Sequence, residues 1–577
     1  MIEKIMKAVK SSNKRRGRNI TIGAVVGFLL SCTAVMGADD YLWIKGDSGK
    51  IEFNKAETTA SDGSWNKGNP YENAGNTWKE NTYTNNMKLS SNGANGKDGN
   101  KEISYGLRLS GDLNDMNFIN NSSITGEIRD SGIEYGPGYG IYNESTKMGN
   151  IENTGEISGT GTGNGYGIYN SNSVKMKNIT NTGEISGTGS GFNGKGGNGY
   201  GIYNLGTIRD ITNTGEISGT GKGDGSGDGT GYGIYNLGTM GAITNAGVIS
   251  GTGKSTSGKS TSGKSTSGKS EGYGIYNILS TMGAITNEGV ISGTGKSTSG
   301  KSEGYGIYNS LSTMGDITNT GEISGTGNGA GSGYGTGYGI NNGAGTMGAI
   351  TNEGVISGSG TSSGDDGSGF GIYNGATMGD IENTGLISGA GNSTVDNNNK
   401  TGTGTGIHNN ISNDKQMGKI TNIGIINGYG KGSDNQGMGN GEGYGINNES
   451  GIMGAITNIG VISGSGSGGG SSNGDGYGIN NKSGTIGDTT NTGVISGYGS
   501  SGDSGSGYGI HNGSSGTMGT ITNTGVIYGK TNAIKNEKSD NITVNNYGIL
   551  VTKGSSGVDG LTTSNNYGLI IKNEGEN

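Results

Sequence analysis

A five-residue motif, Tyr-Gly-Ile-Tyr-Asn, recurs in twelve copies between Tyr139 and Asn512 and constrains the fold more than any other feature. Its third position is Ile and its fifth is Asn in every copy, whereas its fourth is Tyr, Asn or His. Successive copies start 27 to 41 residues apart. A repeat of this length predicts a solenoid, in which each unit contacts only its neighbours and stacking builds one continuous core.

Two further short boxes follow each copy of the motif, and each box holds one more apolar slot. In the fourth unit the boxes read Ala-Ile-Thr-Asn at 242–245 and Val-Ile-Ser-Gly at 248–251. The second-box Asn and the third-box Ile are present in all twelve units. Fixed β-branched slots in short segments bounded by Gly predict strands rather than helices.

Three such segments per unit predict an all-β fold, a parallel β-helix solenoid for which we expect right-handed winding. The three Ile slots would then form three ladders inside the stack. The fixed Asn residues are expected to form stacked amide ladders at the corners, each side chain bonded to its counterparts above and below. Asn and Gly also tolerate the left-handed backbone that we expect at the corners.

Unit length varies almost entirely after the third box, in Gly-, Ser- and Thr-rich stretches of which the longest is 251–272. A solenoid tolerates insertions at one edge, because they leave the stack intact. We expect a repeat array over 105–530 and short terminal coils over 531–577. In total we expect about 13–15 coils, each stacked on the previous one at the strand spacing of a sheet. Residues 38–104 are expected to form a small N-terminal cap and a polar segment, since an open solenoid end invites edge pairing.

Residues 1–37 have the pattern of an export signal. Seven basic residues and one acid precede an apolar run over 20–30, and small residues follow. This pattern predicts a signal peptide cleaved near Gly37 and Ala38. The apolar run is shorter than the roughly 20 residues of a membrane-spanning helix. Residues 29–32 loosely resemble a lipoprotein box that would lipidate Cys32; the alternative is that Cys32 is an ordinary residue of the removed leader.

Composition restricts the partners and the core of the mature chain. Only 28% of the residues are apolar, which is too few for a compact globule but enough for the thin core of a solenoid. Without residues 1–37 the chain carries a net charge of −14 and no cysteine. The fold must therefore hold without disulfides, and neither nucleic acid nor an anionic membrane is expected as a partner.

Several segments match chemical motifs, but each has a plainer interpretation. Residues 253–260 fit the nucleotide-binding P-loop pattern, yet the helix that such a loop requires cannot follow them. His408 and His511 occupy the fourth motif position three coils apart, about 14 Å by strand spacing, too far to share a metal ion. Gly-Asp clusters such as 223–225 leave weak calcium binding by loops open.

Acidic residues likewise give no sign of an enzyme. The Glu of the third box, as at Glu216, is replaced by Val in other units, as at Val248. A position that alternates in this way is typical of an exposed strand residue rather than of a catalytic carboxylate. The sequence therefore predicts no catalytic residue, no cofactor and no metal site.

Tyrosine at the fourth motif position is the candidate binding feature. On stacked coils these side chains would form an exposed aromatic ladder that binds sugar rings or protein by stacking. The alternative is that the rings only stabilise the stack. The predicted ladder comprises Tyr142, Tyr169, Tyr203, Tyr235, Tyr276, Tyr308 and Tyr373.

The leader and the array over about 105–571 together resemble the passenger regions of type V secretion autotransporters, and among these the adhesin-like repeat proteins with Asn-x-Gly-x-Ile units. The resemblance implies export, passage through an outer-membrane barrel, and display at the cell surface or release outside the cell. It also implies a role in adhesion, with a protein or glycan on a host or neighbouring cell as the partner.

One feature departs from this family. Its members end in a translocator barrel of about 250–300 residues, whereas this sequence ends at Asn577 in the coil pattern. We expect an outer-membrane transporter acting in trans, a truncated product, or release. Two other functions stay open: a polysaccharide-binding or polysaccharide-cleaving β-helix protein, and a passive structural rod or immune decoy.

Overall fold

In the computed structural model, the described residues lie between Tyr41 and Lys572. The predicted signal peptide, its cleavage site at Gly37 and Ala38, and Cys32 lie outside the described residues. The described residues are 41–47, 50–54, 75–92, 96–98, 101–128, 136–256, 258–259, 265–266, 268–331, 333–394, 400–411, 415–433, 439–469, 472–500, 505–539, 542–552, 558–559 and 564–572.

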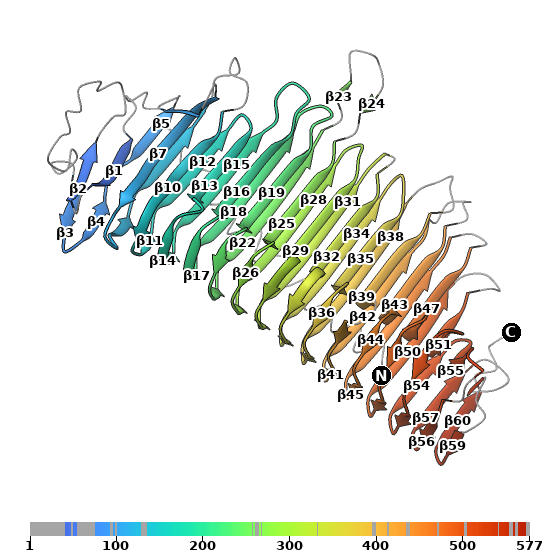
Figure 1. Ribbon diagram of the computed structural model, residues 1–577. Helices are drawn as coiled ribbons and strands as arrows, with labels where there is room; N and C mark the ends of the chain where they lie inside the picture. Colours follow the sequence, from blue (N-terminus) through green and yellow to red (C-terminus); the bar gives the residue numbers. More distant parts are fainter. Residues whose placement is uncertain are drawn as a thin grey trace. The chain divides into compact units, whose positions relative to one another are not determined.

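Parallel strands stack into successive coils along the chain (Figure 1). The third-box strands form one sheet of sixteen strands among the described residues, from β5 (Leu89–Asn92) through β9 (Ser123–Glu127) to β60 (Leu569–Lys572). This arrangement confirms the predicted all-β, parallel β-helix. Sixteen strands in this sheet are one more than the 13–15 coils that the sequence predicts. The extra strand is β5, which precedes the predicted array and already pairs in parallel with β9. Within the described ranges, no helix is long and apolar enough to cross a membrane.

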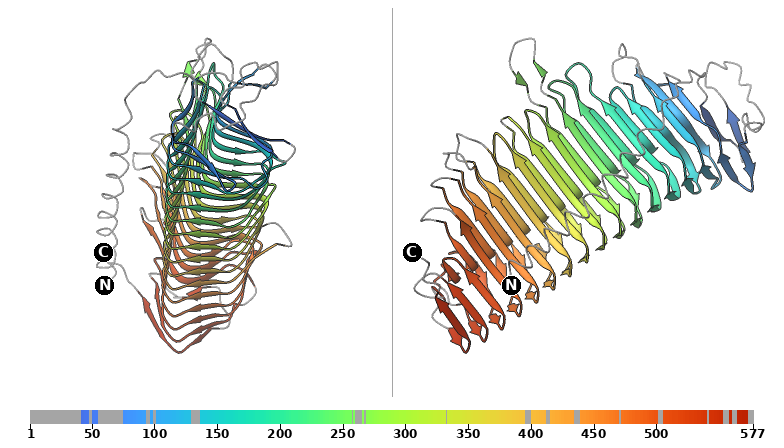
Figure 2. Two further views of the ribbon diagram at one scale, coloured as in Figure 1. Left: turned by 90° about the vertical axis from the view of Figure 1, so that its left-hand side faces the viewer. Right: turned by 180° about the vertical axis from the view of Figure 1, so that it is seen from behind.

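One coil of the array shows how the boxes are placed. The strands of its three boxes are β13 (Asn164–Asn170), β14 (Lys175–Asn181) and β15 (Glu184–Ser190). They pair in parallel with β16 (Gly197–Asn204), β17 (Thr207–Asn213) and β18 (Glu216–Gly223) of the next coil. The register places Ile168 opposite Ile202, so each box residue lies against the same residue of its neighbour. Figure 2 shows this stacking from two further sides.

Two departures from the regular coil lie at the N-terminal end and at one edge. The strand β1 (Leu42–Asp47) pairs antiparallel with β2 (Lys50–Asn54) and parallel with β7 (Lys101–Asp112), so a hairpin continues the stack. In the longest insertion, β23 (Gly258–Lys259) and β24 (Ser265–Thr266) form a short antiparallel pair that projects from the upper edge in Figure 1.

Four apolar ladders fill the interior, one more than the sequence predicts. The three Ile ladders are confirmed: Ile141, Ile151 and Ile157 of the three boxes are each 0% exposed, as are most of their counterparts. The fourth ladder comes three residues before the second-box slot, where unbranched Met adapts to an irregular corner. Its members are Met148, Met176, Ile208, Met240, Met282, Met314, Met347, Met378, Met417, Met453, Ile486 and Met518.

Two buried Asn ladders run along the stack, as predicted. In the second-box ladder, Asn153 Nδ2 donates to Asn181 Oδ1 at 2.8 Å, and the same pattern continues without a break from Asn85 to Asn566. Asn153 Nδ2 also lies 3.1 Å from the carbonyl of Gly155 and 3.0 Å from that of Glu184. Each amide thus ties a corner to the next coil.

The repeated glycines serve a different purpose from the one predicted. Positive φ angles occur at Gly194 and a few other described glycines, but not at the glycines between the second and third boxes, such as Gly155, so the left-handed backbone expected at these corners is wrong. A Cβ on Gly159 would lie 1.9 Å from the carbonyl oxygen of Tyr166. The first-box and third-box strands therefore pack backbone against backbone, at a distance that admits no side chain.

Candidate functional site

The predicted Tyr ladder lies on the outer side of the first-box strands, where its rings are half-buried. Tyr142 and Tyr169 stack with centroids 5.1 Å apart and planes 7° apart, and this pattern continues from coil to coil to Tyr308. Asn341 then takes the fourth position and separates Tyr308 from Tyr373. The structure therefore brings six of the seven predicted residues into one continuous column.

A second aromatic column, which the sequence did not predict, runs beside the first. It is built from the first motif position, where adjacent rings stack with centroids 4.7–5.6 Å apart. The two columns meet edge to face, as between Tyr166 and Tyr169 at 5.4 Å and 84°. The second column comprises Tyr105, Tyr139, Tyr166, Tyr200, Tyr232, Tyr273, Tyr305, Tyr338 and Phe370.

A sequence signal for this column existed, since the first position is aromatic in every copy except at Thr405. Strict alternation along a strand places positions one and four on opposite faces. Here the strand register passes from Tyr166 directly to Ile168 and omits Gly167. This irregularity allows Tyr166 and Tyr169 to share the outer side.

The intact columns offer ring edges rather than ring faces. Tyr169 is parallel to within 7° with Tyr142 and to within 6° with Tyr203, so both of its faces are covered. Burial raises the pKa of Tyr235 to about 12, so its hydroxyl stays a neutral donor. The stacked rings therefore stabilise the coils, at about 0.5–1.5 kcal/mol per pair, and present their edges rather than their faces to a partner.

The second column is interrupted at Thr405. Phe370 on β35 (Gly367–Asn374) and Tyr444 on β43 (Gly441–Ser450) flank Thr405 on β39 (Gly402–Asn410) in register. Ring stacking ends at Phe370 and resumes between Tyr444 and Tyr477 at 5.0 Å. A cavity of about 530 Å³ opens at this point, lined by these residues. Thr405 is fully buried, and its Oγ1 has no hydrogen-bond partner in the part of the chain that the structure describes.

A polar column replaces the tyrosines beside this cavity. Four fourth-position residues of successive coils, His408, Asn447, Asn480 and His511, form one hydrogen-bonded chain. His511 Nδ1 lies 2.7 Å from Asn480 Oδ1, Asn480 Nδ2 donates to Asn447 Oδ1 at 2.9 Å, and Asn447 Nδ2 lies 3.2 Å from His408 Nδ1. The two histidines are thus three coils apart, with amides between them.

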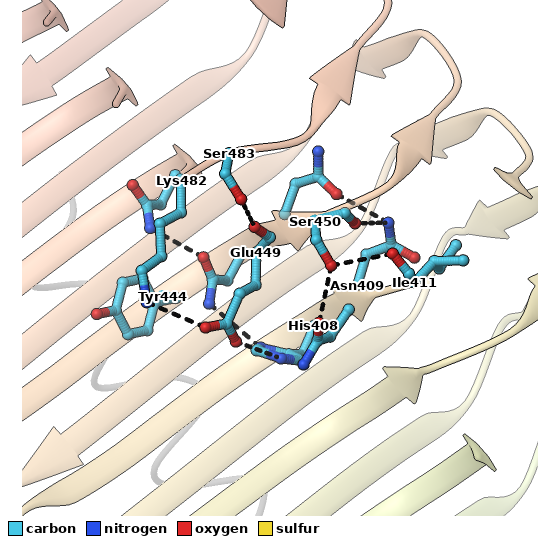
Figure 3. Close-up of polar contacts among 12 residues, drawn as sticks. His408, Asn409, Ile411, Tyr444, Glu449, Ser450, Lys482 and Ser483 are labelled. Atoms are coloured by element: carbon cyan, nitrogen blue, oxygen red, sulfur yellow. Dashed lines mark hydrogen bonds and ion pairs between the residues drawn. The ribbon is translucent and has the colours of Figure 1, made fainter. Parts of the chain in front are cut away.

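Glu449 contacts His408, which is the first residue of this hydrogen-bonded chain (Figure 3). Its carboxylate lies 3.4 Å from His408 Nε2 and 3.0 Å from Lys482 Nζ. The contact with His408, followed by that with Lys482, lowers the pKa of Glu449 to about 2, against the opposing effect of burial. Glu449 is therefore ionised at any pH near neutrality.

The other two carboxylates of the cavity are differently placed. Glu442 accepts a hydrogen bond of 3.1 Å from Tyr444 Oη, and burial raises the pKa of this carboxyl above its usual value. Glu537 lies 3.4 Å from His511 Nε2. Burial lowers the pKa of His511, and Glu537 partly offsets that effect.

The described residues include no group of three or more His, Cys, Asp and Glu side chains that could hold a metal ion. The P-loop-like segment begins inside β22 (Val248–Ser255) and includes β23, and the strands β24 and β25 (Ser270–Ile278) follow it among the described residues. Its residue 260 lies outside the described ranges.

Known proteins provide no relative from which a function could be transferred. No family model matches the chain, and no curated protein and no solved structure is significantly similar to it. The aromatic columns and their interruption at Thr405 are therefore the observations from which a function is inferred.

Proposed function

We propose that this chain is an exported, non-catalytic protein of the autotransporter-passenger type that mediates adhesion. Its partner is a protein or glycan on a host or neighbouring cell. The observation that carries the proposal is the outer side of the first-box strands, where two aromatic columns run along the stack and open into a lined cavity at Thr405. Such a surface can contact a second macromolecule along several coils at once.

The leader and the charge of the chain support a role outside the cell, and the coil holds together without added groups. The stack is held by buried amide ladders and apolar ladders, neither of which depends on a disulfide or a cofactor. The basic and apolar pattern of residues 1–37 supports export, and the acidic mature chain suits a soluble surface that repels its own copies.

The distribution of fixed and variable positions supports recognition rather than catalysis. Interior positions keep Ile and Asn from coil to coil, whereas the outward fourth position changes from Tyr308 to Asn341, and from Tyr373 to His408. A scaffold that tolerates such changes can alter its surface without altering its fold.

Binding of purified chain to intact host or neighbouring cells tests the proposal. The comparison uses wild type and a variant in which Tyr203, Tyr235 and Tyr276 are changed to Thr, with Thr212, Thr244 and Thr286 changed to Ser as the matched control. We expect the first variant to lose most of the binding and the control to retain it. Absence of binding by wild type would favour a passive rod, and equal binding by all three proteins would contradict a role of the Tyr column in binding. Release of new reducing ends from a glycan panel would favour a cleaving enzyme.

A further inference from the structure

The interruption at Thr405 lies where the other coils carry an aromatic ring. Neighbouring rings of the second column stand one coil apart, so Phe370 and Tyr444 are separated by two coils, about 9.6 Å at the strand spacing of a sheet. The cavity is lined by both residues and by Thr405, so a flat group bound there would meet both rings. Phe370 and Tyr444 are both partly buried, as are Tyr232 and Tyr338 of the intact column.

The charges that line the cavity favour a cation. Three carboxylates face it, those of Glu442, Glu449 and Glu537, against the single ammonium of Lys482. Two of the carboxylates, Glu442 and Glu449, come from the same strand as Tyr444, one on each side of it along β43. A flat cation between the two rings would thus meet carboxylate oxygens along its edges and aromatic faces above and below.

We propose that the interruption at Thr405 binds one guanidinium group, that of an arginine side chain of a protein partner, between Phe370 and Tyr444. A guanidinium is planar and charged, stacks on aromatic rings and pairs with carboxylates along its edge, whereas an ammonium shares only the charge. Arginine is also enriched among the residues that dominate binding at protein interfaces. The proposal specifies the partner chemistry of the proposed adhesive function and rests on it for biological meaning.

The test is made on the purified full chain, so that its failure leaves surface display and cell binding to be judged separately. N-acetylarginine amide is titrated and followed by saturation-transfer NMR. Nα-acetylcitrulline amide is the flat, neutral analogue. Nα-acetyllysine amide, with its free ε-ammonium, is the cation that is not flat. We expect the arginine compound to bind at least about five-fold more tightly than the lysine compound, a difference in binding free energy of about 1 kcal/mol or more. The citrulline compound should not bind at millimolar concentration.

Two variants place the binding in the cavity. Thr405→Tyr fills the gap with the ring that other coils carry, and Glu442→Gln removes one carboxylate without changing its shape. Each should weaken arginine binding about ten-fold or more, whereas Asn341→Tyr, which adds a ring to the other column, should leave it unchanged. Equal binding of arginine and citrulline, unchanged affinity in Thr405→Tyr, or a preference for a neutral oligosaccharide that Thr405→Tyr abolishes would overturn the proposal.

Discussion

Asn245 Nδ2 donates a 2.8 Å hydrogen bond to Asn287 Oδ1 in the next coil, although the two residues are 42 positions apart in the sequence. The longest insertion of the array lies between them, and the bond has the same length as that between Asn287 and Asn319, where the separation is 32 positions. The second-box ladder thus keeps its geometry whatever the length of the intervening loop. This independence explains how the array accommodates insertions of different lengths.

Removal of one amide from this ladder should destabilise the neighbouring coils. Asn287 accepts from Asn245 and donates to Asn319. Asn287→Leu therefore leaves the buried Asn319 Oδ1 without its donor, and Asn245 Nδ2 keeps only its two longer bonds to backbone carbonyls. We expect a loss of about 2–4 kcal/mol in the free energy of unfolding. Urea denaturation with hydrogen exchange measures it, and Glu288→Ala, at the exposed next position, is the control. A loss below about 0.5 kcal/mol in Asn287→Leu would mean that the ladder contributes little.

Substitution of glycine by alanine should destabilise the chain at the close-packed glycines and not at the others. A Cβ at Gly325 would lie 1.9 Å from the carbonyl oxygen of Tyr338, whereas at Gly343 its nearest neighbour is the hydroxyl of Tyr308 at 3.4 Å. Gly325→Ala should therefore cost about 2 kcal/mol or more, and Gly343→Ala less than about 0.5 kcal/mol. Thermal unfolding of both variants tests this, and equal melting temperatures would contradict the backbone-against-backbone packing.

Completion of the second aromatic column should stabilise the chain. The ring in Thr405→Tyr can stack on Phe370 and Tyr444, and the substitution removes a buried hydroxyl that has no partner within the described residues. We expect a gain of about 0.5–1.5 kcal/mol per new ring contact, seen as a higher melting temperature. A melting temperature below that of wild type would show that the residues around the gap cannot accept a ring.

Acid should remove the contribution of Glu449 to stability. The pKa of this carboxyl is lowered from 4.5 to about 2, so its contacts with His408 and Lys482 stabilise the folded chain fully above pH 4.5. That contribution is lost as the pH falls from 4.5 towards 2. Glu449→Gln should be less stable than wild type at pH 7, and the difference should shrink over this interval. The side chain is 35% exposed, so screening keeps the effect small. A constant difference from pH 7 to pH 2 would contradict the assignment.

The sequence predicted those parts of the fold in which one residue type marks one slot. The Ile141 ladder and the Asn153 ladder follow from fixed spacing, because these slots keep one residue type in nearly every unit. The ladder of Met148 has an equally regular spacing. Met has no strand preference, however, so the sequence did not indicate that these side chains point into the core. The purpose of Gly159 depends on the opposite strand, which lies elsewhere in the sequence.

The candidate site was only partly predictable for a related reason. The column of Tyr169 was visible as a slot, but the column of Tyr166 was not, because alternation assigns these positions to opposite faces. The interruption at Thr405 is a single departure from the motif. Its meaning appears only when Phe370 and Tyr444 are seen to lie on either side of it.

Protease treatment of intact cells that express the chain from its own gene tests the central claim most directly. The claim is that the repeat array is displayed outside the cell, where its aromatic surface can meet a partner. We predict that trypsin added to intact cells cleaves the array while a periplasmic marker stays whole. An array that is protected until the outer membrane is permeabilised, and then cleaved together with that marker, would contradict the claim.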